Sequence, residues 1–121
     1  MIVEPVDERD SSWEDAHPRF RAYLFAGGDA PGRSWSVETY DVRGADVLEV
    51  VQWAEAQAGP DRLCAVALVV QHAAGRGLVW LLGADANSPP RDEAEHRALA
   101  VMTARRAARR QAVRRPPGPV R

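Results

Sequence analysis

The sequence predicts an α+β domain with a mostly antiparallel sheet of about four strands and two helices, in the order ββαββα. Two observations support this class. Four short segments are either alternating or continuously apolar, as strands are, and two longer segments repeat their apolar residues with the 3.6-residue period of a helix. We expect both helices to cover the same face of the sheet.

The first two strands are predicted from alternation. In Pro18–Phe25, apolar and polar side chains point to opposite faces, and Ser34–Val42 shows the same pattern. The connecting segment, Gly27–Arg33, is rich in glycine and turn-forming residues. The two strands should therefore form a hairpin.

The first helix is predicted over ADVLEVVQWAEAQAGP, with Asp46 in its first turn. Gly59 suits the position that follows a helix, and Pro60 prevents continuation. Two continuous apolar runs follow, Leu63–Val70 and Leu78–Leu82, separated by QHAAGRG. We expect a second hairpin whose strands are buried on both faces, or nearly so.

The second helix is predicted to open after Ser88 as a possible N-cap, with Pro89 at its first position. Its apolar stripe runs to Met102 and would then continue through Arg105 and Arg109. An arginine cannot replace a core residue without an unpaired buried charge. The packed part of the helix should therefore end near Ala104, and removal of residues 105–121 should leave the fold intact.

Three regions follow from this interpretation: an irregular acidic arm over 1–17, a single α+β domain over 18–104, and a basic tail rich in arginine and proline over 105–121. Residues 1–95 hold all 17 acidic residues and eight of the 16 arginines, whereas residues 96–121 hold the other eight arginines and no acidic residue. Such asymmetry is typical of a basic interaction tail.

The tail is the main candidate for binding an anionic surface. Its candidate residues are Arg105, Arg106, Arg109, Arg110, Arg114 and Arg115. They could neutralise the phosphates of nucleic acid without reading its sequence. The alternatives are a solvated tail, or one folded back on the acidic part of the chain. The tail has no aromatic residue to stack on bases, which counts against a single-strand binder.

Trp53 is the candidate for partner binding. On the first helix it falls about 120° from the apolar stripe, by the 100° rotation per residue of a helix. An exposed tryptophan is a common interface anchor. The alternative is that the N-terminal arm or a loop covers it. The second face of the sheet, partly apolar at Leu63–Val70 and Leu78–Leu82, also favours a homodimer or a complex with another protein.

The sequence gives little support for catalysis, and we predict no catalytic residue, metal or cofactor. Glu93 and His96 have the spacing of carboxylate-bridged metal sites, and Asp92 and His96 share a helix face, but such sites need a second matching helix. Cys64 lies in an apolar run and is predicted to be a buried thiol. The chain begins without an apolar signal segment, and no apolar run approaches the ~18 residues of a membrane span. We expect a cytoplasmic protein that does not enter the membrane.

The stretch from PRFRAYLF through WSVETYDVRGADVLEVVQWAEAQAG to GLVWLLGADAN resembles small α+β proteins of actinobacterial genomes. The resemblance covers about residues 18–87 and implies a cytoplasmic accessory protein. It implies no catalytic residue and no substrate. The excess of alanine, arginine, glycine and valine, with no lysine, is likewise typical of a GC-rich bacterial genome.

Three functions remain open from the sequence. The first is a non-enzymatic module that docks on a protein partner, with its basic tail on an anionic surface. The second is a nucleic-acid-associated protein that binds through the arginine-rich helix, independently of sequence. The third is a small enzyme whose site forms at a dimer cleft near Asp85.

Overall fold

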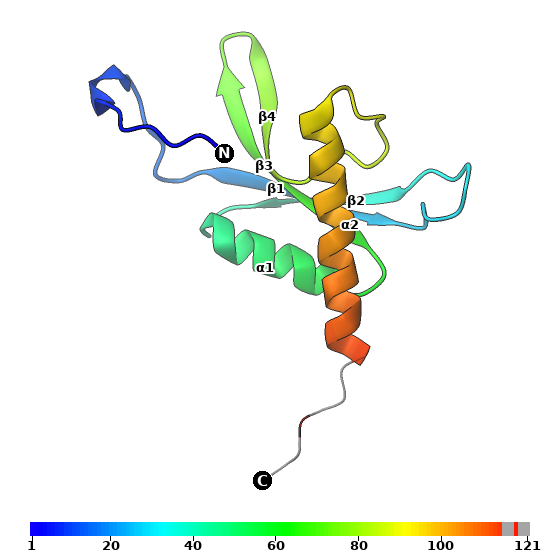
Figure 1. Cartoon of the computed structure of the whole chain (residues 1–121). Helices are drawn as coiled ribbons and strands as arrows, with labels where there is room; N and C mark the ends of the chain where they lie inside the picture. Colours follow the sequence, from blue (N-terminus) through cyan, green and yellow to red (C-terminus); the bar gives the residue numbers. More distant parts are fainter. Residues whose placement is uncertain (115–117, 119–121) are drawn as a thin grey trace.

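The computed structural model describes residues 1–114 and 118, and within them the predicted order ββαββα is confirmed. A short 3-10 turn, η1 (Glu8–Asp10), precedes the domain. The elements that follow are β1 (Arg19–Ala26), β2 (Ser36–Val42), α1 (Val47–Ala58), β3 (Leu63–His72), β4 (Gly75–Leu82) and α2 (Glu93–Arg114). The strands form one antiparallel sheet in the order β2-β1-β3-β4 (Figure 1). The α+β class with a four-stranded sheet is confirmed.

The two helices cover opposite faces of the sheet, so the expectation of a single covered face is wrong. Side chains alternate along a strand, and Phe20, Ala22 and Leu24 of β1 pack with Val50 and Ala54 of α1. On the other face, Phe25 of β1 and Ala65 of β3 pack with Met102 of α2. Because the central strands are apolar on both faces at this end, each face needs a helix to cover it.

The second hairpin is buried very unevenly. The first five residues of β3, Leu63–Ala67, are buried, whereas β4 is exposed from Gly75 to Leu81. The expectation that both strands are buried is therefore wrong for β4. The reason is position: β4 is an edge strand, while α1 packs on β1 and β3 and α2 packs on β3. Both strands also extend through QHAAGRG, leaving Ala73 and Ala74 as the turn.

Helix α1 begins and ends where the sequence predicts. The Asp46 carboxylate accepts a hydrogen bond from the Glu49 N–H at 2.8 Å, and the Glu49 carboxylate accepts one from the Asp46 N–H at 3.1 Å. This capping box satisfies two N–H groups that the helix itself cannot pair. At the other end Gly59 adopts φ 60°, a conformation that glycine reaches without steric cost, and its N–H donates to the Glu55 carbonyl.

Helix α2 begins later than predicted, at Glu93 and not at Pro89. The Asp92 carboxylate accepts a hydrogen bond from the Glu95 N–H, while the Ser88 hydroxyl donates to Asp85 and caps nothing. The reason is the Pro-Pro pair, because Pro90 disfavours helical backbone in the residue before it. Among the described residues, no helix is both long and apolar enough to cross a membrane.

Candidate interaction surfaces

The last turns of α2 direct four arginines toward the C-terminal end of α1 and the start of β3. We call Arg105, Arg106, Arg109 and Arg110 the arginine clamp. Arg105 and Arg109 both donate to the Glu55 carboxylate, with Arg105 Nε 3.1 Å from Oε2 and Arg109 Nη1 3.0 Å from the same oxygen. Figure 1 shows this part of α2 running past the end of α1. The helix is thus held by α1 well beyond Ala104.

Main-chain carbonyls supply the remaining acceptors of the clamp. Arg109 donates to the Gly59 carbonyl at 2.8 Å and to the Arg62 carbonyl at 2.7 Å, and Arg110 donates to the Pro60 carbonyl at 2.7 Å. The end of a helix carries unpaired carbonyls and a partial negative charge, which favours cations placed there. The clamp therefore caps the C-terminal end of α1 and the loop that follows it.

Arg106 is buried in spite of its charge. Its side chain donates to Asp29 at 2.8 and 3.1 Å, and its guanidinium carbon lies 5.7 Å from the centre of the Trp35 ring. Only 6% of the residue is exposed. The ion pair and the aromatic face compensate the cost of burying this charge.

The expectation that α2 stops packing near Ala104 is therefore wrong. Of the six tail arginines predicted to bind anions, four form the clamp, Arg114 is exposed at the end of α2, and Arg115 lies outside the described residues. Sequence reasoning missed Asp29 and Glu55 as their partners, because these acids lie 77 and 50 residues away along the chain from Arg106 and Arg105. The one available signal was the surplus of acid in residues 1–95.

The arginine clamp lowers the pKa values of its two acidic partners, Glu55 and Asp29. Burial by itself raises the pKa of Glu55, but the hydrogen bonds and charges of Arg105 and Arg109 outweigh it and hold that pKa below its usual value. The hydrogen bond from Arg106 likewise lowers the pKa of Asp29. The Asp29 side chain is 55% exposed, so solvent weakens this pair more than the pairs of Glu55.

The pKa of a third acid, Asp41 on β2, is also lowered. The hydrogen bond from Arg21 is the main cause that lowers the pKa of Asp41 to about 2, and Arg19 adds to it. All three acids therefore stay ionised in the folded chain at pH values where the unfolded chain takes up protons.

We expect the free energy of unfolding to fall as the pH is lowered from about 5 toward 2. A carboxyl whose folded-state pKa is depressed stabilises the fold above its unfolded pKa of roughly 4, and that contribution is lost as the pH falls through the folded value. Urea unfolding at a series of pH values measures this. A stability that is flat from pH 5 to 2.5 would show that the ion pairs of Glu55, Asp29 and Asp41 contribute nothing.

Trp53 is partly covered, and Tyr40 of β2 packs against it. Trp53 is 37% exposed, and its ring meets the Tyr40 ring of β2 edge-on, with the ring centres 5.4 Å apart. The neighbour of Trp53 is therefore the other edge strand of the sheet. The remaining exposed part is open to a partner, and its role in binding stays a prediction.

A larger apolar surface lies on β4. We call Leu78, Val79, Trp80 and Leu81 the β4 patch; these residues are 38%, 49%, 36% and 44% exposed. The patch presents side chains on both faces of the sheet, because Leu78 pairs with Val69 and Val79 pairs with Leu68 on the alternate face. Trp80 is anchored by the Tyr23 ring, with the ring centres 5.0 Å apart.

The two edges of the sheet differ in charge. β2 carries Glu38 and Asp41 among its seven residues, whereas Arg76 is the one charged residue of β4. Charged side chains and proline are common means of keeping an edge strand from pairing with another chain. From Gly77 to Leu82, β4 has neither.

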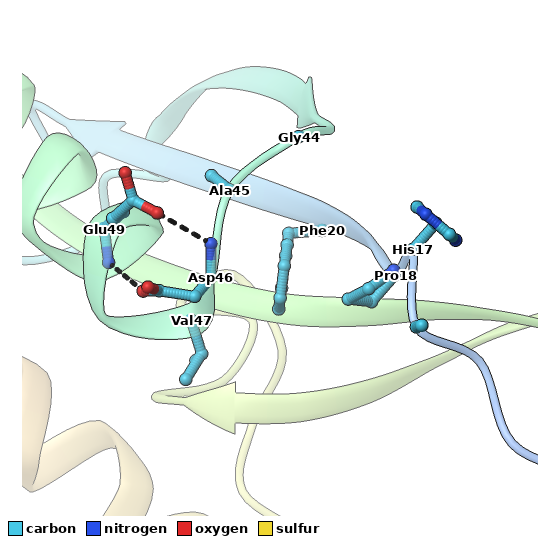
Figure 2. A pocket seen from close by; sticks show the side chains of 9 residues that line it. His17, Pro18, Phe20, Gly44, Ala45, Asp46, Val47 and Glu49 are labelled. Carbon is cyan, nitrogen blue, oxygen red and sulfur yellow. Dashed lines mark hydrogen bonds between the residues drawn. The ribbon is translucent and has the colours of Figure 1, made fainter.

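An open pocket of about 620 Å³ lies where the N-terminal arm meets the start of α1 (Figure 2). His17 and Pro18 line one side, and Phe20 and Ala45 give it an apolar floor. Its carboxylates, Asp46 and Glu49, are held in the capping box of α1. Both acids of the pocket therefore stabilise the start of the helix.

Two further residues that could take part in chemistry, Cys64 and Asp85, are respectively buried and hydrogen-bonded within a turn. Cys64 is buried, and its burial raises the pKa of the thiol. The Asp85 carboxylate accepts from the Asn87 N–H and from the Ser88 hydroxyl within a turn. In residues 1–114 and 118, no three His, Cys, Asp or Glu side chains gather as metal ligands would.

Comparison of the chain with protein-family models, with curated proteins and with solved structures finds no match.

Proposed function

We propose that this chain is a non-enzymatic binding module that docks on a protein, either another protein or a second copy, through the β4 patch. The observation that supports the proposal is an edge strand with four consecutive exposed apolar residues. The proposal keeps the cytoplasmic location that the sequence predicts.

An exposed apolar edge strand offers two kinds of binding energy to a protein. Its unpaired N–H and C=O groups can extend a sheet, and its side chains can be removed from water at the same time. Trp80 gives the patch a tryptophan already fixed against Tyr23, and such aromatic anchors dominate many interfaces. Scattered exposed apolar residues are ordinary, but here four of them follow one another along one edge strand, and grouped exposed apolar residues are typical of a binding site.

The nucleic-acid hypothesis has less support than docking on a protein. It depends on arginines that are available to phosphates, and four of its six candidates donate to Glu55, Asp29 or main-chain carbonyls within the chain. A phosphate would have to displace these partners. The enzyme hypothesis depends on Asp85, which is engaged in its own turn.

The test compares two lysine variants in the full chain. Val79→Lys places a charge in the β4 patch, and Val37→Lys is the matched control, because Val37 is 43% exposed on the opposite edge strand. The tagged chains are used to capture proteins from lysate of the cells that encode the chain, with and without nuclease treatment. We expect at least one protein to be retained by the unchanged chain and by Val37→Lys, and lost with Val79→Lys.

Two results would contradict the proposal. One is capture that is the same for all three chains, which would show that the β4 patch is not the docking surface. The other is the loss of all bound protein on nuclease treatment, which would favour the nucleic-acid hypothesis.

A further inference from the structure

We propose that the loop between β1 and β2 is a strap that opens while the rest of the domain stays folded. We call Gly27–Trp35 the strap. Its last residue, Trp35, packs against the core cluster that Phe25 of β1 forms with Met102 of α2. The closed strap therefore covers this cluster, and its opening would uncover it.

The side chain of Asn87, in the segment before α2, holds the end of the strap. The Trp35 N–H donates to Asn87 Oδ1 at 2.8 Å, and Asn87 Nδ2 donates to the Trp35 carbonyl at 2.9 Å. A side-chain amide can accept and donate at once, so one residue satisfies both main-chain groups of Trp35. Asn87 is itself fixed, because its N–H donates to the Asp85 carboxylate at 2.9 Å.

Arg106 of the arginine clamp holds the strap at two further points. Its guanidinium donates to both carboxylate oxygens of Asp29, at 2.8 and 3.1 Å, and its carbon lies 5.7 Å from the centre of the Trp35 ring. Within residues 1–114 and 118, every side-chain hydrogen bond or ion pair between the strap and another part of the chain ends on Arg106 or Asn87.

The remainder of the strap buries little surface. Its residues from Asp29 to Ser34 are all exposed. A segment with few buried apolar contacts and exposed polar attachments opens at a lower free energy than the fold as a whole. The two strands need not separate, because the ladder between β1 and β2 ends at the pair of Ala26 and Ser36, before the strap.

Opening of the strap changes what the domain exposes. In the closed form only 6% of Arg106 and 1% of Met102 are exposed. Release of Asp29 and Trp35 would open the guanidinium and one side of the apolar cluster to water. The strap contains no residue of the β4 patch, so this inference is independent of the proposed function.

Native-state proteolysis of the full chain tests whether the strap opens by itself. Trypsin cleaves after Arg33, within the strap, and after Arg106, within α2, and mass spectrometry of the fragments distinguishes the two cuts. The initial rate of cleavage after Arg33 should be the faster one and should depend only weakly on urea, because the urea dependence of an opening grows with the surface it exposes. Cleavage after Arg106 requires α2 to unfold and should rise steeply with urea.

The variant Asn87→Ala tests the attachment of the strap. We expect it to raise the rate of cleavage after Arg33 roughly tenfold, as the loss of two hydrogen bonds predicts. The matched control is Ser88→Ala, because the Ser88 hydroxyl donates to Asp85 in the same turn and not to the strap. Gly28→Ala is a second variant from the other side, since a Cβ at Gly28 would lie 2.3 Å from Trp35 Cδ2 and displace the ring. It should also speed this cut.

Two outcomes would overturn the inference. If cleavage after Arg33 in the unchanged chain follows the same urea dependence as cleavage after Arg106, the strap opens only when the whole fold does. If the rate after Arg33 is the same in Asn87→Ala, Gly28→Ala and Ser88→Ala, the loop is cut without leaving its attachments. The urea series on the unchanged chain decides the first point even where a variant fails to fold.

Discussion

Ending the chain at Ala104 is expected to lower its melting temperature by roughly 10 °C or more, which corresponds to a loss of about 3 kcal/mol for a domain of this size. The truncation removes the whole arginine clamp, including Arg106, which is buried and paired with Asp29, and the two hydrogen-bonded partners of Glu55. It also leaves the carbonyls of Gly59 and Pro60, directly after α1, without these donors. Removing the partners of Glu55 is costly because this carboxylate, whose side chain is 20% exposed, stays largely desolvated.

The matched control is a chain that ends at Arg114, which keeps the clamp and all of α2. Thermal unfolding followed by circular dichroism should show this control melting within a few degrees of the full chain. If the chain ending at Ala104 melts at the same temperature as this control, the clamp contributes nothing to stability, and the sequence-based expectation of a dispensable segment beyond Ala104 would be correct after all.

Gly83→Ala is expected to destabilise the fold by roughly 2–5 kcal/mol. Gly83 follows β4 with φ 72°, where a residue with a Cβ costs about 1–2 kcal/mol. A Cβ built there would lie 2.6 Å from Met102 Cγ, 2.7 Å from Met102 Sδ and 3.2 Å from Ala65 Cβ. Met102 is fully buried, so it cannot move aside freely, and overpacking a core costs about 1–3 kcal/mol more.

The variant Gly32→Ala separates the cost of the backbone conformation from the cost of the collision with Met102. Gly32 has nearly the same backbone, φ 76°, but no atom lies within 4 Å of the Cβ that the substitution would add. Urea unfolding of both variants should therefore show a larger loss for Gly83→Ala, and the difference measures the collision with Met102. Equal losses in the two variants would mean that Met102 yields without cost and that α2 is not tightly seated on the sheet.

The class and order of the elements can be predicted from the amino-acid sequence, because they depend on patterns between near neighbours. Alternation in Pro18–Phe25 gave β1, and the acidic first turn and Gly59 gave the limits of α1. The predicted burial of Cys64 is also confirmed. The late start of α2 also has a local cause. Pro90 disfavours helical backbone at Pro89, and this outweighs the suitability of Ser88 as an N-cap.

Which surfaces are covered could not be predicted, because it depends on contacts between residues far apart in the chain. Apolar content alone made β3 and β4 look alike, but β3 lies between two strands and β4 at an edge, and strand order is a long-range property. For the same reason the helices could not be assigned to opposite faces. The arginines at the end of α2 show this dependence on distant residues most clearly. Arg106 is predicted from the local sequence as an anion-binding residue of the tail, whereas in the fold it is buried against Asp29, which is far away in the chain. The cost of burying a charge depends on such a partner, and the local sequence does not contain it.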